Sequence, residues 1–397
     1  MSSFDELIIE AGVNPGTGMR DHYDLDPALI FLNQGSYGAV AKPLKAAQDR
    51  WRLEIDRNPD GFIRDRWPEL QRASRMALAA FLGTEAHLIG LVANATSGLQ
   101  AAAMAAPLKP GQKILITNQT YPALVNILRH VSVLRGTEIV TIDLPSTPES
   151  GACLLDRLET YLADDVGLMV VDHITSPTAT RFPVADVIRI CKAQGVPVLV
   201  DGAHAPGHVP LNLTELDADW YVGNGHKWLG TPRGTAFIWS NERWLERTET
   251  PVISHNFGKG FETAYVQYGT IDYSAWASIP DALTWYRKLD QAGAFAHAKT
   301  LLATNYAEIA DRLEADLITD PDDPGMMAAM LLPRDYTADM AIPLRLALQR
   351  DHGIVAVFIP WQGQRLIARL SCYSYSSQND LDAYLSAVPA ALHSLRG

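Results

Sequence analysis

Between about residues 65 and 240, segments with apolar residues at helical spacing alternate with short apolar segments typical of strands. The segment WPELQRASRMALAAFLG has apolar positions at helical spacing and closes at Gly83, which predicts a helix. SGLQAAAMAA is alanine-rich, follows a Thr-Ser turn and predicts another helix. Between such segments lie short β-branched runs bounded by turn residues, namely QKILITN, TEIVTIDL, VGLMVVDHI, VPVLVDGA, DWYVG and GTAFIWS.

Several of these runs are apolar on both alternating sets of positions, as strands covered on both faces are. PVADVIRICKAQG has the pattern of a helix that crosses between two of them. The sequence therefore predicts an α/β fold with a mostly parallel, doubly wound sheet. Ligands of such sheets bind at the carboxyl ends of the strands.

The pattern changes after residue 280, where long helical segments lead to an α+β portion containing QRLIARLSCYSYS. We expect a large α/β domain over residues 61–280 and a smaller α+β domain over residues 281–397. Residues 1–60 are expected to form an amino-terminal arm and part of the small domain. A chain of 397 residues is long enough for such a division.

Composition and charge exclude several classes of protein. The formal net charge of −12, with no run of Lys or Arg, argues against a partner that is nucleic acid or a membrane surface. The three cysteines are too widely spaced for a disulfide framework or a zinc knuckle, so no metal site is predicted. The acidic start MSSFDELIIE is unlike a signal peptide, and no apolar stretch is as long as a membrane span. A cytoplasmic protein is the expectation.

Two charged residues follow buried strand-like runs in the middle of the chain. VLVDGAHAPGH carries Asp201 and then His204, and NGHKWLG carries Lys227. An aspartate at such a position either caps the following turn or holds a heterocyclic nitrogen protonated. A lysine with restricted access to water is either part of an ion pair or an amine nucleophile toward an aldehyde. The occurrence of Asp201 and Lys227 together favours the second interpretation of each.

Two further segments offer anion-binding groups. The small-residue turn in LVANATSGLQ opens a helix and presents N–H groups and hydroxyls, as a phosphate monoester requires, although an unliganded helix cap has the same pattern. Arg369 interrupts the apolar run LIARLS, where it forms either a structural ion pair or a fork for a carboxylate. A phosphate cradle, a lysine, a strand-end aspartate and a carboxylate-binding arginine together describe a site for pyridoxal phosphate (PLP).

These residues resemble the class V aminotransferase family of fold-type I PLP-dependent enzymes. Asp-Gly-Ala-His, followed by Gly-His-Lys at a twenty-six-residue interval, carries the resemblance, which covers most of the chain. FLNQGSYGAV, RNPDGF, HITSPTATRFPV and VFIPWQGQRLIARLS look most like the isopenicillin N epimerase-like branch. That branch also contains C–S lyases, so the resemblance leaves the reaction open.

The resemblance implies a role for each matching residue. Lys227 would form an imine with the cofactor and act as the catalytic base, Asp201 would contact the ring nitrogen, and His204 would lie near the phenolic oxygen. The other implied cofactor ligands are Tyr121, stacked over the ring, and Ala95, Thr96 and His226 on the phosphate. Gly269 and Thr270 match a pair that reaches the phosphate of a neighbouring subunit, which implies a homodimer.

The implied substrate-binding residues are fewer. Arg369 would hold the α-carboxylate of an amino acid, and Asn33, Ser36 and Tyr37 belong to a segment that lines the substrate entrance. The substrate side chain is not predicted. Residues that could line its pocket, each equally able to be a surface or packing residue, are Trp361, Arg64, Arg66, His255 and Lys259.

One departure from the family pattern argues against a cysteine desulfurase reaction. Cysteine desulfurases carry a nucleophilic cysteine roughly fifteen residues before the arginine, and HGIVAVFIPWQGQ has none. We therefore expect a PLP enzyme that removes the Cα proton of an amino acid, most like an epimerase, with a C–S lyase or an aminotransferase as alternatives. A PLP-fold protein without catalysis would often lack the lysine or the aspartate, and a nucleotide-dependent enzyme would need a glycine fingerprint that is missing.

Overall fold

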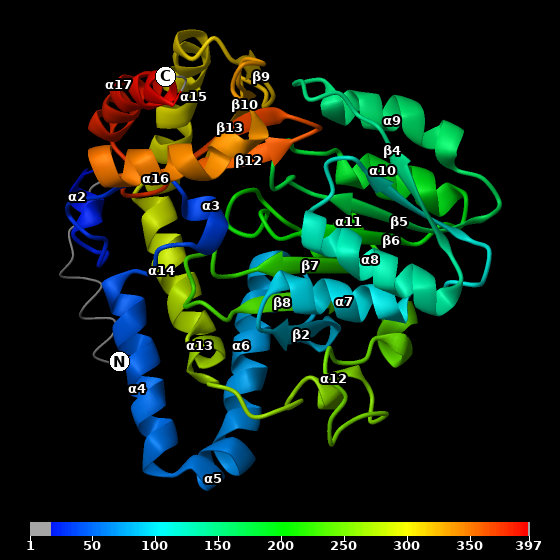
Figure 1. Ribbon diagram of the computed structural model, residues 1–397. Helices are drawn as coiled ribbons and strands as arrows, with labels where there is room; N and C mark the ends of the chain where they lie inside the picture. The colour runs from blue at the N-terminus through cyan, green and yellow to red at the C-terminus, as the bar shows by residue number, and fades with distance from the viewer. Residues whose placement is uncertain (1–16, 396–397) are drawn as a thin grey trace.

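A seven-stranded sheet forms the centre of the computed structural model, which describes residues 17–395 (Figure 1). Its strand order is β2-β8-β7-β6-β5-β3-β4. The strands are β2 (Ile89–Val92), β3 (Lys113–Thr117), β4 (Glu138–Ile142), β5 (Val166–Asp172), β6 (Val198–Gly202), β7 (Trp220–Asn224) and β8 (Ala236–Ser240). β8 is antiparallel to both neighbours and the other strands run parallel to one another, so the predicted mostly parallel sheet is confirmed.

Helices cover both faces of this sheet. Leu168 and Val170 of β5 pack with α7 (Ala95–Ala105) and α8 (Pro122–Arg135). The alternate residues of β5 pack with α6 (Trp67–Leu82), α9 (Ser150–Tyr161) and α10 (Val184–Ala193). Successive side chains of a strand point to opposite faces, which is why β5 is apolar at both sets of positions. α6 ends at Gly83, whose φ of +63° closes the helix.

A second sheet, antiparallel throughout, has the order β12-β13-β10-β9. Its strands are β9 (Asp316–Leu317), β10 (Met327–Leu331), β12 (Val357–Trp361) and β13 (Arg365–Ser371). The helices around it are α15 (Ala294–Arg312), α16 (Ala341–His352) and α17 (Gln378–Ser394) (Figure 1). This unit is the α+β C-terminal domain that the change in pattern predicts.

The amino-terminal segment lies against this second unit. β1 (Ile30–Phe31) pairs in parallel with β11 (Ile354–Val355), and the Tyr23 hydroxyl is 2.9 Å from the Ser374 hydroxyl. One hydrophobic core contains residues from the first fifty positions and from the last third of the chain. The domain boundaries at residues 60 and 280 stay a prediction.

The remaining elements connect these units. α14 (Ile279–Gln291) is a long helix that contacts α6 and α15, and α4 (Lys42–Arg57) is a long helix that lies against α13 (Ser274–Ala277) and α14 (Figure 1). The short helical elements are α2 (Thr17–Arg20), α3 (Gln34–Tyr37), α5 (Pro59–Gly61), η1 (Phe62–Arg66), η2 (Ala86–Leu88), α11 (Leu213–Leu216), η3 (Glu242–Arg247), α12 (Phe261–Ala264), α13 (Ser274–Ala277) and η4 (Ala338–Met340).

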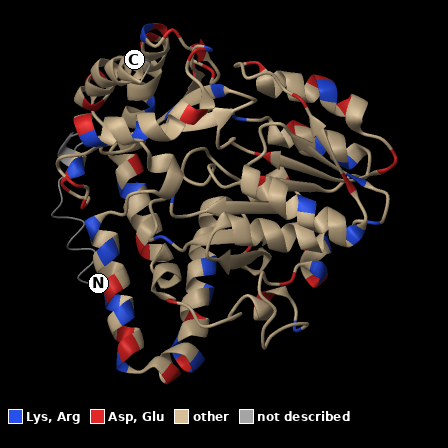
Figure 2. Cartoon of the chain, viewed as in Figure 1, with Lys and Arg blue, Asp and Glu red and all other residues tan. Residues whose placement is uncertain are grey.

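Charged side chains are mixed in sign on the outer helices. In Figure 2, Lys or Arg and Asp or Glu are interspersed along α4, while the strands of the central sheet are mostly uncharged. Within residues 17–395, no helix combines the length and the apolar character needed to cross a membrane.

Candidate active site

The carboxyl ends of the parallel strands surround a cavity of about 250 Å³, which we call the inner lobe. Thr96, Tyr121, Asp201, His226 and Lys227 are among the residues that line it. They come from the turns after β2, β3 and β7 and from the end of β6. The sheet therefore gathers residues that lie far apart in the sequence, as expected for a parallel α/β sheet.

Two carboxylates face the inner lobe side by side. Asp172 ends β5, Asp201 lies near the end of β6, and their Cα atoms are register partners. Leu168 and Leu199 pack on the α7–α8 face of the sheet, and alternation along each strand brings both aspartates to that face. Asp201 was expected from its sequence context, whereas Asp172 was not.

The two carboxylates differ in their proton affinity. Burial raises the pKa of Asp201 to about 6, opposed by a hydrogen bond from the Ala203 N–H (2.9 Å) and by the charge of Lys227. Burial and the neighbouring charge of Asp201 raise the pKa of Asp172 well above its usual value. Asp172 Oδ2 is buried and has no hydrogen-bond partner among residues 17–395. Because two adjacent buried carboxylates do not both ionise readily, Asp201 carries the negative charge and Asp172 holds a proton.

Lys227 lies in the loop after β7, with its amine toward Asp201 and His204. Its Nζ is 2.9 Å from His204 Nε2. Burial lowers the pKa of Lys227 to about 7, the charge of Arg369 acts in the same direction, and Asp201 opposes them. A lysine with a pKa near neutrality is an amine nucleophile and a proton acceptor, which a solvated lysine is not.

Trp228 determines which nitrogen of His204 carries a proton. Its indole Nε1 donates a hydrogen bond to His204 Nδ1 (3.4 Å). The indole N–H can only donate, so Nδ1 is the acceptor. Burial keeps the pKa of His204 well below its usual value, so the ring is neutral and its proton is on Nε2. His204 therefore presents an N–H to the Lys227 amine.

The start of α7 forms one end of the inner lobe. Asn94 Oδ1 accepts the N–H of Ser97 (2.9 Å), and Asn224 Oδ1 accepts the N–H of Ala95 (2.9 Å). Thr96 lies between them and lines the cavity with its exposed side chain. His226 Nδ1 donates to the Thr235 carbonyl (3.0 Å), and burial lowers the pKa of His226 to about 4, so Nε2 is an acceptor that can bind a phosphate when the phosphate or the ring carries a proton. Because side chains accept the N–H groups of Ala95 and Ser97, Thr96 is the residue of this turn that best suits a phosphate group, and the expected role of Ala95 stays a prediction.

Arg369 lies across the cleft, on β13 of the second sheet. Its side chain is buried and bonds Ser36 Oγ (3.0 Å) and the carbonyl oxygen of Ser176. No ion pair to Arg369 occurs within the described residues, and its Nε is buried without a partner. Burial lowers its pKa to about 10, opposed by an interaction with Tyr121. A buried cation without a carboxylate is costly, so Arg369 suits an anionic ligand.

Glycine lets the amino-terminal segment approach the lysine loop. A Cβ on Gly38 would lie 1.9 Å from the carbonyl oxygen of His226, and Gly38 has a φ of +66°. Gln34 Nε2 also donates to the Lys227 carbonyl (2.7 Å). The motif FLNQGSYGAV thus holds α3 against the lysine loop, with Ser36 and Tyr37 lining the cleft.

A second cavity of about 360 Å³, the outer lobe, continues from the inner one. Both lobes share Ser36, Tyr37, Tyr121, Ser176 and Lys227, and the outer lobe adds Arg369 and strand β12. Trp361 lines the outer lobe. The other candidates for the side-chain pocket, Arg64, Arg66, His255 and Lys259, line neither lobe.

Three expected site residues lie outside these cavities. Asn33 precedes α3 and lines neither lobe, although Ser36 and Tyr37 do. Gly269 and Thr270 are exposed in the connection between α12 and α13 and also line neither lobe. Their roles stay predictions, and those of Gly269 and Thr270 depend on a second subunit.

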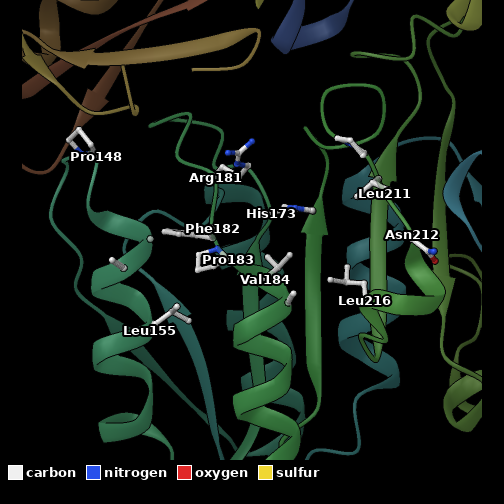
Figure 3. Close-up of a pocket in the computed structure, with 14 residues that line it drawn as sticks. Pro148, Leu155, His173, Arg181, Phe182, Pro183, Val184, Leu211, Asn212 and Leu216 are labelled. Carbon is white, nitrogen blue, oxygen red and sulfur yellow. The ribbon is translucent and has the colours of Figure 1, made fainter. Parts of the chain in front are cut away.

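A broad hollow on the opposite face of the sheet is separate from this cleft. Figure 3 shows it between α9, α10 and α11, with His173, Arg181 and Asn212 among its lining residues. His173 follows Asp172 directly and so points away from the inner lobe, with Nδ1 2.8 Å from the Tyr221 hydroxyl. Burial lowers the pKa of His173 to about 4, which keeps this histidine neutral.

A sequence model of the family described as "Aminotransferase class-V" matches residues 66–384. The chain belongs to the class-V aminotransferase family. It is a PLP-dependent enzyme with the fold-type I architecture. The predicted family, fold and cofactor are confirmed.

Curated relatives span two kinds of activity. The chain is 26% identical over 382 residues to isopenicillin N epimerase of Streptomyces clavuligerus, with 92% of this chain and 96% of that protein covered. It is 29% identical over 355 residues to a putative L-cysteine desulfhydrase of Oryza sativa subsp. japonica, with 83% and 74% covered.

Solved structures agree in fold. The cysteine desulfurase CsdA of Escherichia coli has a TM-score of 0.76 at 19% identity, with 94% of this chain and 98% of that chain covered. The cystine C–S lyase C-DES has a TM-score of 0.77 at 18% identity, with 91% and 97% covered. Likeness at this level of identity shows the fold and not the reaction.

The donor set of the inner lobe fits PLP. The charge of Asp201 suits a protonated ring nitrogen, and Asp172 Oδ2 is an orphaned polar atom in the same cavity. Thr96 at the start of α7 suits a phosphate, and the low pKa of Lys227 suits attachment to an aldehyde. The sequence missed Asp172, although VVDH ends a buried strand in the same way as VLVDG. It also missed Ser176 and Trp228, whose contacts depend on the tertiary fold.

Proposed function

We propose that the enzyme removes the Cα proton of a free amino acid at Lys227, and that its reaction is an epimerisation or racemisation. The proposal rests on two groups across the cleft: a lysine with a pKa of about 7, and a buried arginine that forms no ion pair within the described part of the chain. An amino acid whose carboxylate is bound by Arg369 would lie within the shared lobes beside Lys227. The relationship to isopenicillin N epimerase supports this choice.

The proposed roles of the residues follow from their surroundings. When bound, PLP supplies an aldehyde for the amine of Lys227 and a pyridinium ring that withdraws electrons from Cα. Asp201 would keep the ring nitrogen protonated, and the start of α7, with His226, would hold the phosphate. His204 donates its Nε2–H at the lysine end of the lobe. Lys227 accepts the Cα proton, because its pKa of about 7 matches a proton that is taken up and returned near neutral pH.

Epimerisation also requires a proton donor on the other face of Cα. We assign this role to Tyr121, which lines both lobes and interacts electrostatically with Arg369. Replacement of Tyr121 by Phe would then retain the exchange of the Cα proton with solvent but lose the formation of the opposite enantiomer. Equal loss of both activities would contradict the assignment.

Incubation with single amino acids in deuterated water tests the proposed function. Deuterium at Cα together with the opposite enantiomer, and without keto acid, pyruvate or thiol, supports epimerisation. Pyruvate with a sulfur product would instead identify a C–S lyase, an alternative that the desulfhydrase relative favours. A keto acid with the pyridoxamine form of the cofactor would identify an aminotransferase. No exchange with any amino acid would contradict all three.

A cysteine desulfurase reaction through a persulfide is disfavoured by the state of the thiols. Burial raises the pKa of Cys191 and of Cys372 to about 12, so neither is a thiolate at neutral pH. Cys153 lies on α9 and lines neither lobe of the cleft. These properties agree with the missing cysteine before Arg369.

We further propose a cytoplasmic homodimer in which Gly269 and Thr270 reach the cofactor phosphate of the partner. Their exposure, and that of the nearby Val252, Ile253 and Phe257, supports this arrangement. Sedimentation of the purified enzyme tests the assembly. Replacement of Thr270 by Ala should weaken binding of the cofactor without changing the mass of the dimer.

A further inference from the structure

Strand β12 forms an apolar wall on one side of the outer lobe. Val357, Ile359 and Trp361 alternate along the strand, so their side chains share one face, and all three line the cavity. Val357 lies opposite Arg369 in the antiparallel β12–β13 pair, and directly opposed residues lie on the same face. The wall therefore extends from the arginine that suits the substrate carboxylate.

The facing side of the outer lobe is also apolar. Tyr121, Pro122 and Pro177 line it from the large sheet. Trp361 joins the two sides, since its indole N–H donates to Ser146 Oγ in the loop before α9 (2.8 Å). A side chain that enters the outer lobe thus lies between two apolar surfaces.

Two of the neutral polar residues that line the outer lobe, Asn118 and Thr120, form hydrogen bonds within the protein. Asn118 donates its Nδ2 to the Leu144 carbonyl (2.9 Å) and accepts the Leu144 N–H with Oδ1 (3.1 Å). Thr120 Oγ1 accepts the Thr117 N–H (3.1 Å). Among the described residues that line the lobe, Lys227 and Arg369 are the charged ones, and the proposed function assigns both to the reacting end of the substrate.

We infer that the substrate is an α-amino acid with an uncharged, apolar side chain (aliphatic, aromatic or thioether) that packs against Val357, Ile359 and Trp361. This inference rests on the proposed function. A carboxylate, ammonium or amide group packed against Val357 and Ile359 would lose hydration without gaining a hydrogen-bond partner from these side chains, whereas an apolar group of the same shape gains from burial. The cavity of about 360 Å³ has room for a side chain larger than that of cysteine.

Leucine, asparagine and aspartate test the inference, because their side chains have nearly the same shape and differ in polarity. The holoenzyme is assayed in deuterated water for kcat/KM of Cα–deuterium exchange. Dissociation constants are measured by titrating the visible absorbance of the cofactor. We expect leucine to exceed asparagine by about tenfold or more in both measurements, with aspartate weaker still. Equal values for the three, or a preference for aspartate, would overturn the inference.

A charge placed on the wall should weaken the preference for leucine over aspartate. Ile359→Lys is expected to raise the ratio of aspartate to leucine, in both kcat/KM and affinity, by about tenfold or more. Gln364→Lys is the matched control, since it adds the same charge to the exposed β12–β13 turn, outside the lobe. An equal change in both variants, or none in Ile359→Lys, would contradict the assigned wall.

Failure of the inference and failure of the proposed function give different results. Exchange with amino acids of every polarity contradicts the side-chain assignment and leaves the Cα chemistry intact. No exchange with any amino acid contradicts the proposed function. In that case the dissociation constants of leucine and aspartate, measured by the absorbance titrations, still test the inference. Equal constants, or no binding of either amino acid, would overturn it.

Discussion

The two sides of the cleft differ in their chemistry: one contains groups that exchange protons, and the other contains a fixed charge that suits substrate binding. On the side of the large sheet, Asp172, Asp201, His204 and Lys227 form a cluster in which each proton position depends on a neighbour. On the side of the second sheet, Arg369 is a permanent cation within an apolar wall. Chemistry that moves protons requires groups that titrate near neutral pH, whereas recognition requires a fixed charge and a fixed shape. Substitutions on the two sides should therefore affect different kinetic parameters.

The largest effect is expected for Lys227→Ala. Loss of the proton-accepting amine should reduce kcat for Cα–deuterium exchange by about a thousandfold or more. Lys109→Ala, at an exposed position outside both lobes, is the control. Retention of substantial exchange by Lys227→Ala would contradict the role of this residue.

The two aspartates should respond differently to the same change. Asp201→Asn removes a negative charge and should lower kcat by about a hundredfold. Asp172→Asn replaces a protonated carboxyl by a neutral group of similar shape and should lower kcat by about threefold at most. Measuring kcat for both variants under the same conditions tests this expected difference. Equal losses would show that the proton is shared between the two carboxyls.

Arg369→Lys separates binding from chemistry on the other side of the cleft. The substitution keeps the positive charge and removes the planar fork, so KM should rise by about tenfold with a smaller change in kcat. Steady-state kinetics with the best amino acid measure both parameters. A fall in kcat at constant KM would place Arg369 with the proton-transfer groups instead.

The smallest effect concerns Trp228. In the wild type, PLP binding to the apoenzyme should accelerate as pH rises through about 7, because the neutral amine of Lys227 is the reactive form. Trp228→Phe frees His204 Nδ1 to take the proton, so Nε2 can accept from a charged lysine. This change favours the charged form, and the midpoint should move upward by about one pH unit.

Tyr373→Phe is the control for the Trp228 experiment. It removes the hydrogen bond from the Tyr373 hydroxyl to the Trp228 carbonyl (2.9 Å) and leaves the indole N–H in place. The midpoint should stay at its wild-type value in this variant. Equal shifts in both variants would indicate a general loosening of the loop. ¹⁵N spectra of histidine-labelled apoenzyme, assigned with His204→Gln, report the tautomer directly.

The sequence was most informative where the pattern is local. The strands are short apolar runs, and Asp201 and Lys227 follow two of them, so the fold, the cofactor and much of the inner lobe could be predicted. The outer lobe could not be predicted in the same way. Ser36 and Ser176 bond Arg369 across 333 and 193 residues of sequence, and nothing in the spacing of these residues indicates such contacts.

Asn118 shows the same limit, and so does the hydrogen bond of Trp361, although Trp361 itself was a candidate for the side-chain pocket and lines the outer lobe. Neither residue type distinguishes a pocket position from an ordinary surface or packing position. Their roles depend on which hydrogen bonds are already satisfied, and that information exists in the folded chain alone. Tautomer preferences are also invisible in sequence, because they depend on the direction of a single donor such as the Trp228 indole.

The pairing of β1 with β11 has a consequence for biosynthesis. Ile30 emerges from the ribosome more than three hundred residues before its partner Ile354. The helix with Ser36 and Tyr37 therefore lacks its docking strand until nearly the whole polypeptide has been made, as does the contact with Arg369. A nascent chain can complete its central sheet early, whereas the side of the cleft that contains Arg369 is completed only when the final segment has been made.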